Sequence, residues 1–470
     1  MGTDLSEWVA HPLGEQPEVE EWSTVADTFA GRVHIEWDTA TPVTPLGQLP
    51  FFIEYLKQGG LFDGWVADCP LLFTSPNAPR KRDVLGTLLL SVLGHRRYAH
   101  VTALRCDAVN PPLLGMSKVV SEDALRRGLA KIDKTAGVQW VQAHLDYCVR
   151  PLLDEPWVLD VDATIKPLYG HQEGAVVGYN PRKPGRPSHC YHTYMLSDLR
   201  LVLRVEVHPG DQHNPTHAAT GLWSLLAQLG RERWPRLLRG DAEWGNEGVM
   251  ARVEQEGLPH LFRLRATANV KRALERAMAE RDWSDAGQGW QGKETKLRLM
   301  GGAGNDGWLY CAASSFARWR CWIAPIPGGR CSVLPRCSAA KPEVWEYVAL
   351  VTSLGREILA LGQLYRSRAD CENAFDELKN HWGWGGFTTQ DFETWPPAWR
   401  YNGWSLFVRL ADPDQHREVI TSQPLLLQAI ARKTQHAGRT TLSVSSTHGE
   451  QQAARRAYLR MARFFARLRE

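Results

Sequence analysis

The sequence predicts an α/β protein in which a core of strands and helices carries a β-rich insertion and is flanked by helical regions. Three observations lead to this class. Residues 157–165 alternate between apolar and polar side chains, as a strand with one buried face does. A β-hairpin pattern follows, with strands at 191–196 and 199–207 around a Ser-Asp turn. Residues 364–380 repeat with helical periodicity and divide into an apolar, a solvated and a separate polar sector.

The region before this core is predicted to be helical. Apolar residues recur at helical spacing in three stretches, 49–56, 84–93 and 124–132. In the third, Ser121 is suited to cap the helix, and Arg126 and Arg127 lie on its solvent side. We expect this helix to be the second of a helix-turn-helix unit that enters a DNA major groove. The alternative is a basic amphipathic helix that never touches DNA.

The remaining core elements follow in order. A loop rich in Pro and Gly holds Arg182, Lys183 and Arg186 on extended backbone. Asn214-Pro215 then begins a helix, and the apolar run 235–241 predicts a short strand that ends at Asp241. Taken alone, Asp241 is equally suited to a turn or to a helix cap.

The polar sector of the segment 364–380 contains Tyr365, Arg368, Glu372 and Lys379. On one continuous helix these four side chains fall within an arc of about 60°. Arg368 and Glu372 are also i, i+4 neighbours, so an ordinary surface ion pair is the alternative interpretation.

The spacing Tyr-x2-Arg-x3-Glu-x6-Lys resembles the signature of cut-and-paste DDE transposases of bacterial insertion sequences. The resemblance implies a ribonuclease H-like core in which Glu372 is the last of three acidic metal ligands. The first ligand is followed two residues later by Thr or Ser, which selects Asp162 with Thr164 and leaves Asp160 as the fallback. The second is Asp241. Members of this family carry an insertion before the closing helix, as residues 267–342 here suggest.

The resemblance also implies the chemistry. Three converging carboxylates suit two Mg²⁺ ions, with Mn²⁺ as a substitute, because hard cations prefer oxygen ligands. Tyr365, Arg368 and Lys379 would then hold DNA phosphates beside the metals. Family members nick each transposon end, form a DNA hairpin, reopen it and join the ends to target DNA. Trp345, with Tyr347 as a substitute, is the candidate to stack on a flipped base, and core packing is the alternative.

These expectations divide the chain into six parts: an acidic segment 1–40, a helical DNA-binding region 41–150, a core of 151–266 and 343–395, the insertion 267–342 and a basic helical region 396–470. Double-stranded DNA is the expected partner, bound by a homodimer in a synaptic complex. Residues 1–40 hold nine acids and one arginine, whereas residues 431–470 hold nine cations and two acids. Separate basic blocks suit a polyanion, although a solvated face is the usual alternative for each block.

Composition is consistent with a cytoplasmic protein that binds the nucleoid. No long apolar run indicates a membrane span, and no Cys-x2-Cys pair indicates a cysteine zinc module. Histidines at 189 and 192 leave a zinc site as a remote alternative. Two other functions remain open: a structure-selective metal-dependent nuclease and a catalytically silent DNA-binding descendant. Loss of any of the three acids would favour the silent protein, and all three are present.

Overall fold

The computed structural model describes residues 24–36, 38, 40–92, 101–170, 172–180, 183–212, 215–280, 282–287, 290–298, 306–315, 345–382, 396–414, 416–446 and 451–467. Within these residues the fold is mixed α/β, as predicted, around a mixed ten-stranded sheet with the order β10-β11-β12-β13-β9-β8-β4-β6-β5, in which β7 also pairs with β6. The strands are β4 (Val158–Pro167), β5 (Val176–Val177), β6 (Pro187–Leu196), β7 (Leu201–Pro209), β8 (Leu237–Gly245), β9 (His260–Leu264), β10 (Ser284–Gly287), β11 (Trp290–Arg298), β12 (Asp306–Ser315) and β13 (Trp345–Thr352).

The centre of the sheet is parallel. β4 pairs with β8, and β8 with β9, both in parallel, whereas the outer described pairs are antiparallel. The predicted β-hairpin is present as β6 and β7. Between β7 and β8 runs α8 (Pro215–Leu229), which begins at the predicted proline. After β8, Asn246 caps α9 (Glu247–Gln255) by accepting a hydrogen bond from the Val249 amide.

The insertion differs from the prediction in its connection to the core. Its described part contains α10 (Ala268–Ala279) and the strands β10 to β12. These strands do not form a sheet of their own, because β12 pairs with β13 along its length and β13 pairs with β9. The central sheet therefore continues into the insertion. Residues 316–342 of the insertion lie outside the described residues.

The N-terminal region is helical, as predicted. Its helices are α1 (Leu49–Gln58), α2 (Leu61–Asp68), α3 (Lys81–Val92), α4 (Val101–Leu104), α5 (Asn110–Leu113), α6 (Glu122–Leu129) and α7 (Lys134–Val149). Ser121 caps α6 by accepting from the Ala124 amide. Of the acidic segment, the described part includes a two-stranded hairpin of β1 (Thr24–Thr28) and β2 (Gly31–Ile35).

The C-terminal region is only partly the helical section that the sequence predicts. It contains α13 (Pro396–Ala411), α14 (Val419–Leu427) and α15 (Gln451–Arg467). Between α14 and α15 it forms an unpredicted hairpin, β14 (Ala431–His436) and β15 (Arg439–Val444). The apolar stripe of α15 packs into the core through Ala454, Met461 and Phe465, which are buried.

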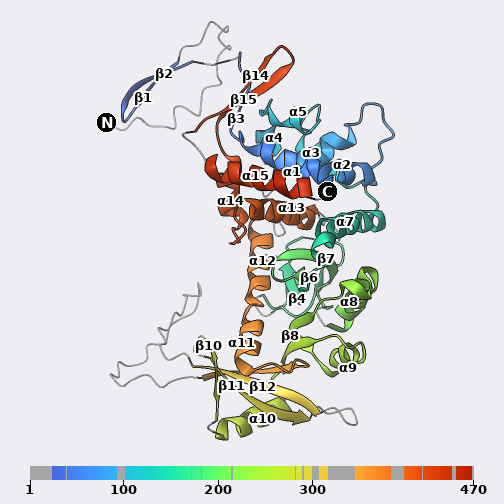
Figure 1. The fold of residues 1–470 in the computed structure, drawn as a ribbon. Helices are drawn as coiled ribbons and strands as arrows, with labels where there is room; N and C mark the ends of the chain where they lie inside the picture. The colour runs from blue at the N-terminus through green and yellow to red at the C-terminus, as the bar shows by residue number, and fades with distance from the viewer. Residues whose placement is uncertain are drawn as a thin grey trace, which may run out of the picture.

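A stack of three indoles joins the two helical regions. Trp65 of α2 lies between Trp140 of α7 and Trp399 of α13, with ring centroids 4.8 and 4.3 Å apart. The N-terminal and C-terminal helices therefore share one core. Figure 1 shows them together at one end of the molecule, with α11 (Ile358–Arg366) and α12 (Ala369–Asn380) running end to end beside the sheet. No helix in the described part of the chain is long and apolar enough to cross a membrane.

Candidate active site

Asp162 and Asp241 follow the same rung of the parallel ladder. The last paired residues of β4 and β8 are Val161 and Gly240, and the two aspartates come next on their strands. Gly240 fits here because a Cβ on it would lie 2.7 Å from the Cβ of Trp244. The sheet therefore places two of the three predicted acids on neighbouring strands.

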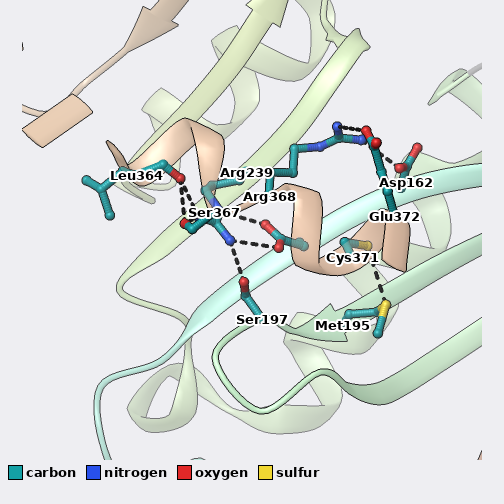
Figure 2. A network of polar contacts seen from close by, with 10 residues as sticks. Asp162, Met195, Ser197, Arg239, Leu364, Ser367, Arg368, Cys371 and Glu372 are labelled. Carbon is teal, nitrogen blue, oxygen red and sulfur yellow. Dashed lines mark hydrogen bonds and ion pairs between the residues drawn. The ribbon is translucent and has the colours of Figure 1, made fainter. Parts of the chain in front are cut away.

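Arg368 joins Asp162 to Glu372. Its Nη2 lies 2.6 Å from Oδ2 of Asp162, and its Nη1 lies 3.1 Å from Oε1 of Glu372 (Figure 2). The side chains of Arg368 and Asp162 are 8% and 13% exposed, whereas that of Glu372 is 64% exposed. The predicted ion pair between Arg368 and Glu372 thus exists, but it belongs to a partly buried bridge and not to an isolated surface pair.

The three acids affect one another electrostatically. Burial raises the pKa of Asp162 to about 7; Arg368 opposes this rise, and the negative charges of Asp241 and Glu372 add to it. Burial alone would lower the pKa of Arg368, but Asp162 reverses this effect and raises it. Asp162 therefore exchanges its proton near neutral pH, and Arg368 remains charged.

Tyr365 lies beside the same charges. Burial raises its pKa, Arg368 and Arg263 lower it, and Asp241 and Asp162 raise it. Arg263, on β9, is exposed and was not predicted. The parallel register indicates its neighbourhood in hindsight, because Gly240 pairs with Phe262 directly before Asp241 and Arg263, at the point where the register shifts.

The polar sector predicted within residues 364–380 does not lie on one continuous helix, which corrects the prediction. Tyr365 is in α11, and Arg368 precedes the first turn of α12. In an unbroken helix the Leu364 carbonyl would accept from the Arg368 amide. Here that carbonyl accepts from Arg239 Nη1 and from Ser367 Oγ, and the Arg368 amide bonds to the Tyr365 carbonyl instead. The break turns Arg368 toward Asp162.

Arg239 and Asp160 form a buried bidentate ion pair beneath this break. Nε and Nη2 of Arg239 lie 2.7 and 2.8 Å from the two oxygens of Asp160, and both side chains are almost completely buried. Arg239 also donates to the hydroxyls of Ser197 and Ser367 (Figure 2). Asp160, the fallback for the first acid, is therefore committed to Arg239. Sequence reasoning missed Arg239, whose partner is 79 residues away.

The three predicted acids are not arranged as a finished metal cluster in the described structure. Within the described residues, no three His, Cys, Asp or Glu side chains stand ready to hold a metal ion. The chemistry of the donors nevertheless fits a divalent cation, because Asp162, Asp241 and Glu372 offer carboxylate oxygens. The Arg368 guanidinium contacts Asp162 and Glu372 and compensates part of their negative charge. A cation held by these carboxylates would compete with Arg368 for the two acids.

Other predicted contacts lie at varying distances from this centre. Lys379 is in the last turn of α12, about 16 Å along the helix from Arg368 by the rise per residue, with its ammonium 6.0 Å from the Phe375 ring centre. Lys379 therefore lies about three helical turns from Arg368 along α12. Lys183 and Arg186 both stack on the exposed ring of Tyr169, 4.8 and 4.7 Å from its centre. Arg182 lies outside the described residues.

The structure gives little support for three further residues predicted to contact DNA. Arg126 and Arg127 form ion pairs with Glu122 and Asp123, one turn earlier in α6. Trp345 opens β13, but its side chain and that of Tyr347 lie outside the described residues.

The histidine pair does not form a zinc site. His189 and His192 are three residues apart on β6, so their side chains point to opposite faces of the sheet. Each binds a different backbone carbonyl, that of Glu173 and that of Gln212.

Comparison with known proteins gives one family and a distant structural likeness. Residues 154–394, half of the chain, match the family model described as transposase DDE domain. Among solved structures, the chain resembles a cryo-EM structure of the piggyBac transposase synaptic complex with hairpin DNA. The match has 12% identity, covers 92% of this chain and 84% of that one, and has a TM-score of 0.38. No curated protein sequence matches the chain.

Proposed function

Because the chain belongs to the transposase DDE domain family, we propose that it is a DNA transposase whose Asp162, Asp241 and Glu372 hold the divalent cations needed to cleave the ends of its element. The observation that carries this proposal is the placement of the three acids. Two follow one rung of adjacent parallel strands, and the third is tied to the first by Arg368. The ribonuclease H-like identity of the core belongs to the same proposal.

The carboxylates would hold Mg²⁺, or Mn²⁺ in its place, which when bound supplies the Lewis acid for phosphodiester cleavage. The protein's own residues prepare this step. Asp162, whose pKa burial raises to about 7, would be deprotonated above neutral pH and would then serve as a ligand. Arg368, once displaced from Asp162 and Glu372, would keep its charge and would be free to donate to a DNA phosphate at the cleaved end.

Tyr365 and Arg263 extend the same positive and hydrogen-bonding surface. Tyr365 is held beside Arg368, and Arg263 is exposed on the strand next to Asp241. Lys379, Lys183 and Arg186 would contact phosphates farther from the reacting bond. We retain Arg182, Arg126, Arg127 and Trp345 as DNA contacts to be tested, together with a DNA hairpin intermediate, a homodimeric synaptic complex and joining of the ends to target DNA.

The test uses duplex DNA that carries the inverted repeats flanking the gene, incubated with the full chain and Mg²⁺. Asp162→Asn, Asp241→Asn and Glu372→Gln should each abolish cleavage and leave duplex binding intact. Asp376→Asn is the matched control, because Asp376 is exposed on α12 one turn beyond Glu372 and accepts a hydrogen bond from the neighbouring Asn380 side chain. Cleavage that survives in the three variants would refute the assignment.

A structure-selective nuclease would use the same acids without strand transfer. The two functions separate when a target plasmid is added. A transposase joins the cleaved 3′ ends to the plasmid, whereas a nuclease releases fragments only. A silent descendant would bind the ends and cleave nothing.

A further inference from the structure

The β14–β15 ribbon is a protruding arm. At its base β14 pairs with β3 (Val43–Thr44) through Ala431 and Arg432 only, and the Lys433 amide bonds to the Pro42 carbonyl. Beyond Lys433 the two strands pair only with each other, and Ala437 and Gly438 close them in a two-residue turn with φ of 49° and 76°. Figure 1 shows the ribbon standing away from the helices around it.

One face of the ribbon is entirely polar and entirely exposed. Side chains alternate along each strand, and directly paired residues share a face. The register therefore puts six residues on this face: Arg432, Thr434, His436, Arg439, Thr441 and Ser443. All six are exposed. The opposite face includes the buried Ala431 and the partly buried Lys433 and Leu442, so it is the side that leans on the protein.

The ribbon carries positive charge without any compensation along its own sequence. Residues 431–444 contain Arg432, Lys433 and Arg439 and no aspartate or glutamate. An isolated two-stranded hairpin is only marginally stable in water, and this one adds almost nothing to the core. Its composition is therefore explained better by a ligand outside the protein than by folding.

We propose that the β14–β15 ribbon inserts its Arg432–Arg439 face into the major groove of duplex DNA. The inference rests on the proposed transposase function and adds a contact surface to it. A B-DNA major groove is about 12 Å wide and accepts a two-stranded ribbon. The guanidinium groups match guanine edges or phosphates, and the hydroxyls of the same face bond to either.

This contact serves binding and not the chemical step. The ribbon lies beyond the C-terminal helices, whereas Asp162 and Glu372 lie where α12 meets β4 (Figure 1). Loss of this contact should lower the affinity for DNA and the discrimination between DNA sequences. It should leave the residues of the cleavage site unchanged.

The experiment measures the affinity of the full chain for duplexes of the element end and of scrambled sequence, across a salt series. Arg432→Gln with Arg439→Gln removes two cations from the ribbon. Lys271→Gln with Arg272→Gln is the matched control, since both residues are exposed on α10 at the opposite end of the molecule. The single Arg439→Gln, beside the turn, provides a second variant that leaves the anchored base of the ribbon untouched.

We expect the ribbon variant to reduce the salt slope by about two units and to reduce discrimination between the duplexes at least about tenfold, with the control unchanged. Unchanged slope and discrimination in both ribbon variants would overturn the inference. An equal loss in the α10 control, or an equal loss on an RNA duplex, whose major groove is too narrow for a ribbon, would also overturn it. If the wild-type chain binds no duplex at all, the proposed function fails as well.

Discussion

Arg368 donates from Nη2 to Oδ2 of Asp162 at 2.6 Å, and this contact ties the start of α12 to β4. The same guanidinium reaches Glu372. Arg368 therefore compensates, in the cation-free protein, the repulsion among acids that a divalent cation would otherwise compensate.

Arg368→Gln should destabilise the cation-free protein and increase its response to metal. Removing one partner of a buried pair costs about 3–5 kcal/mol, because the other charge is left unpaired. Mn²⁺ no longer competes with Arg368 in the variant, so the rise in melting temperature on adding Mn²⁺ should exceed that of the wild type. Arg356→Gln, at an exposed site before α11, is the control. A smaller response to Mn²⁺ in Arg368→Gln would show that Arg368 does not occupy the cation's place.

The affinity for Mn²⁺ should depend on pH through Asp162. Its pKa of about 7 means that protons compete with the cation below neutrality. We expect the dissociation constant to rise about tenfold per unit below pH 7 and to level off above it. Calorimetric titration between pH 5.5 and 8.5 tests this, and a flat profile would contradict the role of Asp162 as a ligand.

Arg239 should act as a positioning residue. Arg239→Met leaves Asp160 buried and unpaired, so we expect a loss of about 3–5 kcal/mol in the free energy of unfolding. Adding Asp160→Leu removes the unpaired charge and should recover most of this loss. The double variant still lacks the bonds to the Leu364 carbonyl and to Ser367. It should therefore fold but bind Mn²⁺ more weakly than the wild type; equal affinity would show that the network only supports the fold.

Acid should destabilise the protein through His192. Burial lowers its pKa from 6.5 to about 4. Between these values the unfolded chain takes up a proton that the folded chain does not, so stability falls as pH drops from 6.5 to 4 and is unaffected above. His192→Gln should reduce this slope by up to about 1.4 kcal/mol per pH unit in urea denaturation. An unchanged slope in His192→Gln would refute the assignment.

Short-range sequence patterns correctly predicted those strands and helices whose own residues carry a clear signal. Alternation marked the strand of Asp162, and the Asn-Pro pair marked the start of α8. The helix break at Ser367 had no such signal, because its cause is Arg239, 125 residues from the Leu364 carbonyl. Glu377 of α12 is buried, where it accepts from the Val419 amide, 42 residues away.

The ribbon of β14 and β15 escaped prediction for a different reason. Its strands are polar on the exposed face, and the other face mixes the apolar Ala431, Leu442 and Val444 with three polar residues, so only weak apolar alternation marks them. Long-range pairing and externally directed side chains are the features that a single sequence conceals.

Mn²⁺ binding to the full chain without DNA tests the central claim most directly. Electron paramagnetic resonance counts the bound ions in the wild type, in Asp162→Asn, Asp241→Asn and Glu372→Gln, and in the control Asp376→Asn. Each of the three acid variants should bind Mn²⁺ at least about tenfold more weakly, and the control should match the wild type. Wild-type binding in all three acid variants would contradict the assignment of these residues as one metal site.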